Sequence, residues 1–291
     1  MTEDEWLAGR FEEHRDHLRG VAYRMLGSLS EADDALQDAW IRVSRADSTD
    51  IENMRGWLTT IVARVALNKL RSRRRRREEP FEAHVPDPVI SPDGEFQPED
   101  QALLADSVGL ALQVVLESLS PPERLAFVLH DMFDLPFDEI APMVGRSSVA
   151  ARQLASRARR RVRSAAAGEP DPDVTAQREV VDAFFRAARG GDFDGLVAIL
   201  DPDVVLRADY GPGRPGSKVF RGPEAVTSQA RPVPGAVITP ILVNGSAGVI
   251  ITLHGRPLAV MGFAIVDRRI VEIDAIADPD RVGYLAAALQ P

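Results

Sequence analysis

The sequence predicts a multidomain chain in which two all-α domains precede a third, α+β domain. Apolar residues keep helical spacing through most of the chain up to Ala165, and a proline-rich acidic segment interrupts them. Short apolar runs typical of antiparallel strands then fill the last part of the chain. Because 291 residues exceed the usual size of one core, several compact units are expected.

The composition favours a soluble cytoplasmic protein with no membrane partner. Hydrophobic residues make up 45% of the chain, and no apolar run reaches the roughly 18 residues of a membrane helix. The first residues, MTEDEWLAGRFEEHR, are too acidic for a secretory signal, and cysteine is absent. With no metal ligand set and no glycine-rich phosphate loop, we expect no cofactor and no metal, and a monomer is the default.

The net charge of −9 hides a strong segregation of charge along the chain. Arginines cluster at 71–77 and again along SSVAARQLASRARRRVR at 147–163, whereas no lysine or arginine occurs between Glu78 and Glu123. Phosphate groups respond to local basic patches and not to total charge. Two basic helices therefore predict two nucleic-acid contacts. The acidic stretch is either a solvated linker or a mimic of nucleic acid that lies along a basic groove.

These shifts in composition predict the domain boundaries. A helical domain occupies 1–77, an acidic proline-rich linker 78–103, and a second helical domain 104–166. A short linker at 167–174 contains the phrase GEPDPD, and an α+β domain occupies 175–291.

The second helical domain carries a predicted helix-turn-helix. The phrase at 120–123, Ser-Pro-Pro-Glu, has the cap, prolines and glutamate of a helix start. DEIAPMVGR supplies a helix and a glycine turn, although Pro142 is expected to be tolerated only in an opening turn. The next helix projects arginine and glutamine, which pair with guanine and adenine, and the alternative is a solvated surface helix. Its outward residues are Arg152, Gln153, Ser156, Arg157, Arg159 and Arg160.

Two helices of the first domain have distinct polar faces. One places Glu31, Asp33, Asp34 and Asp38 beside Gln37, a pattern that is most often only solvated. The next combines aromatic and basic groups with the arginine run, which suits the capture of a separated DNA strand by stacking and charge. Those groups are Trp57, Arg64, Asn68 and Lys69, although Trp57 read alone is more often a core residue.

The last domain should open with a helix and continue as strands. Residues Val180, Val181, Phe184, Phe185 and Ala188 share one helix face. Strands are predicted at 237–243, 248–253, 257–266 and 269–276, with Asp267-Arg268 as a tight turn.

Four polar residues of this domain are candidate catalytic groups. Asp209, Tyr210, His254 and Asp274 lie in or beside apolar runs, where desolvation can raise the pKa of a carboxyl group. The structural interpretation is favoured: Asp209 and Tyr210 begin a loop, and Asp274 pairs with a nearby arginine. We therefore predict that the protein is not an enzyme.

Residues 11–77 resemble region 2 of an extracytoplasmic-function sigma factor of the sigma-70 family, and 104–163 resemble its region 4. The phrases that carry the resemblance are RMLGSLSEADDALQDAW, WLTTIVARVALNKLRSRRRR and LSPPERLAFVLHDMFDLPFDEIA, in the expected order. The resemblance implies a factor that binds core RNA polymerase, at the β′ clamp helices and the β flap, and directs it to promoter DNA.

The resemblance also implies roles for particular residues. Asp33, Asp34, Gln37 and Asp38 would bind the clamp helices. The loop at 46–55 and the helix after it would capture the −10 element through Arg55, Trp57, Arg64, Asn68, Lys69 and Arg71. The −35 element would be read by Ser147, Ser148, Arg152, Gln153, Ser156, Arg157 and Arg160.

The phrase VVDAFFRAARGGDFDGLVAILDPDVVLRAD resembles the opening of a SnoaL-like domain, a cone-shaped fold shared with nuclear transport factor 2. Sigma factors with such a tail are typically regulated in cis, without a separate anti-sigma protein. Three phrases of that subgroup are altered, at 84–88, 209–218 and 278–282. The implied regulatory residues are Asp209, Tyr210, Lys218, His254, Asp274 and Asp280, with a small ligand in the tail and docking of the tail on region 2 and the acidic linker.

The sequence leaves two alternative functions open. One is a SnoaL-like isomerase or hydrolase with a fused DNA-binding region. The other is a helix-turn-helix repressor, which is normally a dimer and needs no polymerase surface. Polymerase-dependent activity distinguishes all three.

Overall fold

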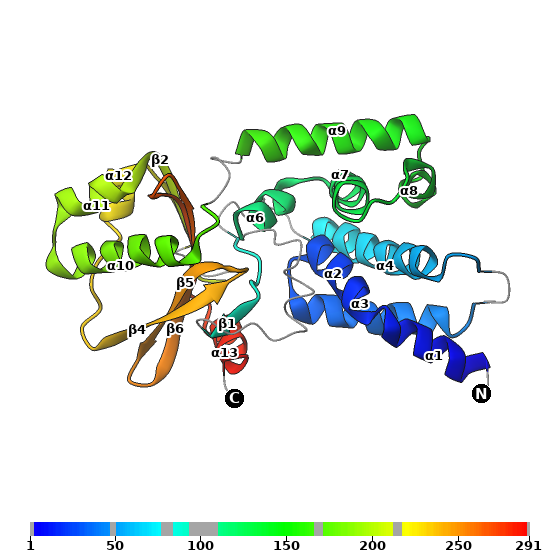
Figure 1. Ribbon diagram of the computed structural model, residues 1–291, viewed down its shortest axis with the longest axis horizontal. Coiled ribbons are helices and arrows are strands. Elements are labelled where there is room, and N and C mark those ends of the chain that lie inside the picture. Colours follow the sequence, from blue (N-terminus) through cyan, green and yellow to red (C-terminus); the bar gives the residue numbers. More distant parts are fainter. Residues whose placement is uncertain are drawn as a thin grey trace. The chain divides into compact units, whose positions relative to one another are not determined.

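The computed structural model describes residues 3–46, 51–76, 84–92, 110–165, 171–211 and 217–289. These residues divide into two compact units (Figure 1). The helical unit contains the helices up to Ala165, apart from the first part of α6 (Leu110–Ser118). The sheet unit contains the residues after 170, the short segment 84–92 and that first part of α6. No helix in the described ranges has the length and apolar character needed to cross a bilayer.

Four helices form the first part of the helical unit: α1 (Glu3–Glu13), α2 (Arg15–Leu26), α3 (Leu29–Val43) and α4 (Met54–Arg76). Gly27 ends α2 in the left-handed conformation, with φ of 77°, and Ser28 then accepts a hydrogen bond from the Glu31 N–H to begin α3. Fully buried Leu18, Leu36 and Leu58 hold α2, α3 and α4 together.

The second part of the unit is a helix-turn-helix, as predicted. It consists of α7 (Pro121–Phe127), a π-helical turn (Val128–Met132), α8 (Phe137–Val144) and α9 (Ser148–Ala165). The Ser120 N–H donates to the Glu123 carboxylate at 3.2 Å, which confirms the predicted helix start. Gly145, with φ of 65°, makes the turn between α8 and α9.

The expectation for Pro142 was wrong. Pro142 lies in the interior of α8, and the helix continues through it to Val144. The missing N–H removes a donor for the carbonyl of Asp138. Both residues are exposed, so solvent can hydrogen-bond that carbonyl.

A buried arginine ties the two parts of the helical unit together. The Arg124 side chain in α7 is 2% exposed and donates to the Arg24 carbonyl of α2 at 2.9 Å and to Glu117 at 2.8 Å. From α4, Arg73 donates to the Leu26 carbonyl at 3.0 Å and approaches the same Glu117 at 3.4 Å. A buried charge is tolerated only when it is paired and hydrogen-bonded. This network therefore fixes α7 against α2 and α4.

The sheet unit is built on a seven-stranded sheet, counted over the described residues, in the order β1-β4-β5-β6-β7-β2-β3. Its strands are β1 (Ile90–Pro92), β2 (Leu200–Asp209), β3 (Lys218–Arg221), β4 (Ala236–Val243), β5 (Ser246–Leu253), β6 (Arg256–Val266) and β7 (Arg269–Ile276). The four predicted strands are confirmed to within two residues at each end. The predicted tight turn is also confirmed, because Asp267 and Arg268 have φ of 49° and 60°.

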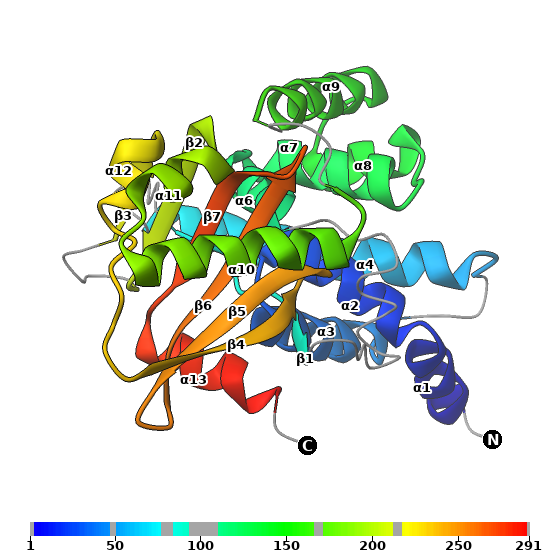
Figure 2. The same cartoon turned by 60° about the vertical axis from the view of Figure 1, so that its left-hand side comes forward.

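Helices cover one face of the sheet. These are α10 (Val174–Gly190), α11 (Phe193–Ile199) and α12 (Pro223–Thr227), and Figure 2 shows α10 crossing the strands. The predicted apolar face of α10 is buried against Leu206, Phe263 and Ile273. On the other face, α13 (Pro279–Ala287) and the segment 84–92 pack around Ile241, Val260 and Ile276. The result is an α+β domain with a separate core on each face.

Replacement of the buried arginine tests its role in stability. Arg124→Ala should lower the free energy of unfolding of the helical unit by about 3 kcal/mol, because Glu117 and the Arg24 carbonyl lose a buried donor. Urea titration followed by tryptophan fluorescence reports this unit, since the three tryptophans are Trp6, Trp40 and Trp57. Arg161→Ala is the matched control: this side chain is 56% exposed, so the cost should stay below about 1 kcal/mol. Equal losses in the two variants would contradict a structural role for Arg124.

Candidate functional site

The predicted polymerase-binding residues share one face of α3. Asp34, Gln37 and Asp38 are exposed, whereas Asp33 is half-buried. Two hydrogen bonds, at 2.8 and 3.1 Å, join Asp33 to Arg19. The Lys69 ammonium group lies 2.9 Å from Asp38. Asp34 and Gln37 are therefore exposed without an ion pair to Lys69, whereas Lys69 partly neutralises the charge of Asp38.

A groove of about 330 Å³ adjoins this face. Phe11, Leu36, Trp40 and Ile41 supply its apolar surface, and Asp33 and Gln37 are among its polar lining residues. Ile41 is 48% exposed, and Trp40 packs edge-to-face on Phe11 with 5.3 Å between the ring centroids. Glu12 and Arg15 also line it, so the groove combines apolar surface with groups of both charges, which suits an amphipathic helix of a partner.

The predicted −10 residues follow one helix, α4. Trp57, Arg64, Asn68 and Arg71 recur every three to seven residues and so share a face. Arg64 and Asn68 are exposed, while Trp57, Lys69 and Arg71 are half-buried. The face therefore combines cations with a half-buried aromatic ring, which is the arrangement expected of a single-strand binding surface.

Arg55, at the start of α4, is exposed and lies 3.0 Å from Nδ1 of His17. Burial, followed by the positive charge of Arg55, lowers the pKa of His17 to about 4, so the imidazole is neutral at physiological pH. Nε2 of the same ring lies 3.0 Å from the Thr59 hydroxyl. Arg55 is thus positioned by a neutral histidine that packs against α4.

Helix α9 presents the predicted −35 residues to solvent. Ser147, Arg152, Gln153, Ser156, Arg157 and Arg160 are exposed, and the half-buried Ser148 donates a hydrogen bond to Asp138. The Arg152 guanidinium lies over the Phe137 ring at 5.3 Å, which holds it near the start of the helix. Glu123 pairs with Arg157 at 3.1 Å. Arg159 was expected to project outward, but it is half-buried and pairs with Asp131 at 2.7 Å.

Residues 84–92, here called the strap, bind along the edge and one face of the sheet. Strand β1 pairs antiparallel with β4, from Ile90 opposite Val243 to Pro92 opposite Ile241. Just before it, the Val89 N–H donates to the Asn244 side chain at 2.7 Å, and the Asn244 N–H donates to the Val89 carbonyl at 2.8 Å. Part of the acidic linker is therefore an ordered strand of the sheet unit, so that part is not a solvated linker.

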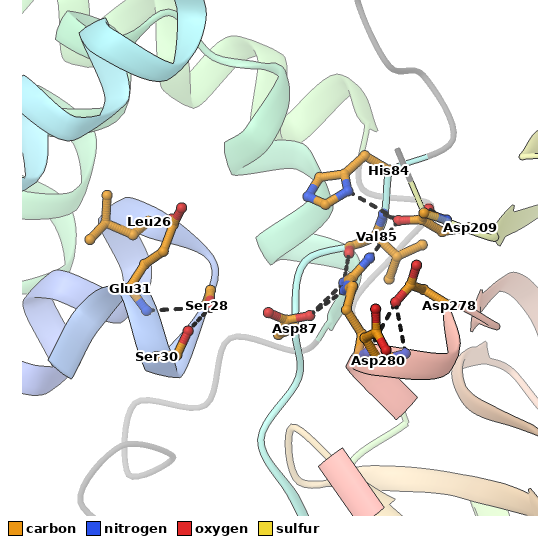
Figure 3. Close-up of polar contacts among 12 residues, drawn as sticks. Leu26, Ser28, Ser30, Glu31, His84, Val85, Asp87, Asp209, Asp278 and Asp280 are labelled. Carbon is orange, nitrogen blue, oxygen red and sulfur yellow. Dashed lines mark hydrogen bonds and ion pairs between the residues drawn. The ribbon is translucent and has the colours of Figure 1, made fainter. Parts of the chain in front are cut away.

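The carboxylate of Asp209 holds the start of the strap (Figure 3). It is fully buried and lies 3.0 Å from His84 Nδ1, 2.9 Å from the Val85 N–H and 2.9 Å from the Gly211 N–H. Burial raises the pKa of Asp209, but the hydrogen bonds from His84 and the two backbone N–H groups more than offset this and hold it well below its usual range. Asp209 is thus a buried, ionised anchor and not the start of a loop.

Arg281 completes the site from α13. Its guanidinium donates to Asp209 at 2.7 Å, to Asp87 at 2.6 Å and to the Val85 carbonyl. Asp278 positions it by accepting the Arg281 N–H at 3.0 Å as the cap of α13. Gly211, with φ of 95°, leaves room for Asp278, because a Cβ atom at Gly211 would overlap the Asp278 carboxylate. The three altered phrases noted in the sequence therefore meet at one place.

Sequence reasoning missed Arg281, although it is the only cation in the phrase at 278–282. The sequence instead predicted Asp280 as the regulatory residue of this phrase. Asp280 is exposed, and its N–H donates to Asp278 at 3.1 Å. Tyr210 and Lys218 are exposed and do not join the Asp209 cluster. His254 was expected beside apolar strands, but it lies in the exposed turn between β5 and β6, with φ of 50°.

Asp274 belongs to a second buried cluster on the strap face of the sheet. Arg207 lies 3.1 Å from Asp274 and also contacts Glu272. Burial, followed by the negative charge of Asp274, raises the pKa of Glu272 to about 8, and burial raises the pKa of Asp274 despite Arg207. The neighbouring Ile273 faces the other side of the sheet, because side chains alternate along a strand. The pairing with an arginine agrees with the structural interpretation of Asp274.

Comparison with known proteins identifies the family. Family models for Sigma-70 region 2 and Sigma-70 region 4 match residues 10–76 and 109–162. The ECF RNA polymerase sigma factor SigJ of Mycobacterium tuberculosis is 43% identical over 220 residues, which cover 74% of this chain and 69% of that protein. The chain is an ECF RNA polymerase sigma factor. A probable sigma factor of the same kind, SigI of M. tuberculosis, is 33% identical over 296 residues and 99% of both chains.

The crystal structure of M. tuberculosis SigJ extends this similarity to the fold. It matches with a TM-score of 0.72 and 34% identity, over 94% of this chain and 97% of that one. In this sigma factor, region 2 reaches from α1 to the end of α4, and region 4 reaches from α6 into α9. The remaining sheet unit is the SnoaL-like tail. Both the predicted fold class and the predicted family are confirmed.

The cluster at Arg207 makes the stability of the tail depend on pH. Because Glu272 has a pKa of about 8 in the folded sigma factor and near 4.5 when unfolded, its protonated form contributes stability at low pH that is lost as the pH rises through about 8. Glu272→Gln imitates the protonated acid. Relative to the parent, the variant should be more stable at about pH 9 than at about pH 6, as measured by calorimetric melting of the tail. Exposed Glu224→Gln should keep the pH dependence of the parent; identical profiles for all three proteins would exclude the cluster as its source.

Proposed function

We propose that this sigma factor binds core RNA polymerase by docking a clamp helix of the β′ subunit against α3, with side chains of that helix in the groove beside α3. Sigma factors bind core polymerase and promoter DNA, and the acidic face of α3 with the partly apolar groove beside it supports this placement. Exposed Asp34 and Gln37 would meet basic and polar groups of the partner, and Ile41 and Trp40 would supply apolar contact. A second polymerase contact, with the β flap, is assigned to region 4.

Charge reversal tests this surface. Asp34→Arg should weaken binding to core polymerase about tenfold, because a basic partner helix would then face a like charge. The affinity is measured by titrating labelled sigma factor with purified core enzyme. Asp182→Arg reverses an exposed charge on α10 and should leave the affinity unchanged. If Asp34→Arg binds as tightly as this control, the acidic face of α3 is not the polymerase contact.

We also propose that α4 captures the −10 element and α9 reads the −35 element. The support is the row formed on α4 by exposed Arg64 and Asn68 with half-buried Trp57, and on α9 the exposed Arg152 and Gln153. Elements named for positions about 25 base pairs apart are separated by about 85 Å along B-DNA, at about 3.4 Å per pair. Buried contacts through Arg124 hold regions 2 and 4 together, so the two regions must separate before both can contact such a promoter.

The regulatory proposal is that the tail restrains this separation through the strap. The strap lies in the chain segment that joins α4 to α6, and this segment, fully extended, could span about 100 Å at about 3.3 Å per residue. When residues 84–92 are anchored on Asp209 and Arg281, they cannot extend, so the distance that the segment can span becomes shorter. The single observation that carries the proposal is the buried Asp209 carboxylate bonded to His84 and Val85 of the linker. The tail would therefore inhibit promoter binding.

Release of the strap should activate transcription. Arg281→Ala removes the contacts to Asp87, Asp209 and the Val85 carbonyl and should raise the yield from a cognate promoter about fivefold, the factor that corresponds to roughly 1 kcal/mol. The measurement is transcription in vitro with purified core polymerase, without which no transcript is expected. Arg268→Ala, which removes an exposed pair with Glu179, is the control and should behave as the parent.

Faster cleavage of residues 84–92 in the Arg281→Ala protein, measured by limited proteolysis, shows that the strap has been released. If the strap is released in this variant but the yield of transcript is unchanged, regulation through this contact is refuted. The absence of promoter-dependent transcripts from every version, across many genomic promoters, would instead contradict the promoter contacts proposed for α4 and α9.

A further inference from the structure

The tail contains an apolar cavity of about 180 Å³ between α10 and the sheet. Phe184 and Phe185 of α10 form one side, and Leu206, Ile251, Met261 and Ile273 of the strands form the other. Phe184, Leu206 and Ile273 are buried, so the inner wall is made of hydrocarbon. Water inside such a wall would find no hydrogen-bonding partner, and an apolar cavity of about 150 Å³ is known to accept a benzene molecule. The cavity therefore has room for a single ring with a short substituent.

The mouth of the cavity is polar and positively charged. Arg189, from the last turn of α10, and Arg231, from the loop after α12, line it together with Gln229, and all three are exposed. No aspartate or glutamate is among the lining residues, which all lie in the described part of the chain. Arg189 donates to the Phe185 carbonyl and Arg231 to the Ser228 carbonyl, each at 3.3 Å and each through Nε, which leaves both Nη groups for other partners. The mouth thus favours an anion.

We propose that this cavity binds a small hydrophobic carboxylic acid, with its ring or short alkyl chain inside and its carboxylate at the two arginines. The planar carboxylate matches the fork of a guanidinium group, whereas the hydrocarbon wall has no partner for a second polar group of the ligand. A neutral analogue of the same shape keeps the apolar contacts and loses the charged ones. Charge at one end and hydrocarbon at the other are therefore both required.

The position of the cavity connects it to the strap. Leu206 lines the cavity from β2, and Asp209, three residues further along the same strand, anchors the strap on the opposite face. Ile273 and Asp274 alternate in the same way on β7. A ligand that orders β2 and β7 would change the stability of the strap contact. This last step rests on the regulatory function proposed above, whereas binding itself does not.

Calorimetric titration of the full-length protein tests the binding site. The probes are benzoate, 4-ethylbenzoate and octanoate, each beside its primary amide. The acids should bind at least about tenfold more tightly than their amides, the factor expected for one charged hydrogen-bonded pair. Arg189→Gln with Arg231→Gln should abolish that difference without weakening the amides, and Arg186→Gln, an exposed arginine of α10 outside the cavity, should preserve it.

Filling the cavity should remove binding altogether. Ala230→Phe places a ring at the mouth and should block acids and amides alike, with circular dichroism confirming the fold. Failure of the parent protein to bind any acid at millimolar concentration overturns the proposal, as does equal affinity for acids and amides. Transcription with and without a bound acid is a separate measurement. Binding without an effect on transcription would refute the link to the strap and leave the site intact.

Discussion

The arrangement of the tail depends on one buried carboxylate. Asp209 is fully buried and ionised, so each donor around it contributes to the stability of the domain. Its donors come from His84 and Val85 of the linker, from Gly211 beside it and from Arg281 of α13. Removing the strap would leave a buried charge short of two partners. The fold of the tail and the position of the linker are therefore coupled thermodynamically.

The two faces of the sheet in the tail differ in chemical character. On the strap face, charged groups are buried and paired, as in the Arg207 cluster and the Asp209 site. The helix face is mainly apolar, and its cavity has a hydrocarbon inner wall. Because side chains alternate along β2 and β7, each of these strands contributes to both faces, and neither face can rearrange alone. This shared construction would connect the proposed ligand in the cavity with the linker on the opposite face.

Local rules predicted much of the fold. The capping phrase before α7, the glycine turn before α9 and the apolar runs of β4 to β7 are short-range signals, and each was found where expected. Strand β2 was missed because Asp201, Pro202 and Asp203 mask its start, although the alternation of Leu206 and Ala208 with Arg207 and Asp209 could have revealed it. Strand β1 could not be predicted from three residues that include a proline, since only its pairing with β4 defines it.

The strap site shows why site residues are harder to predict than elements. Its members are far apart in the sequence, and a single arginine decides the geometry. Periodicity placed Asp34, Gln37, Arg152 and Gln153 on the surface, because a helix face follows from spacing alone. It could not reveal that Glu123 pairs with Arg157, or that a turn carries His254 into solvent. Such contacts depend on tertiary packing.

The strap also closes the edge of the sheet. Strand β4 would otherwise present Ile241, Leu242 and Val243 with unpaired backbone groups, and an open apolar edge of this kind can pair with the same edge of another molecule. When the strap is bound, β1 occupies that edge and contributes a proline at its end. In the proposed regulation, a released strap would leave this edge open to pairing with another molecule, so the released form would be suited only to brief use.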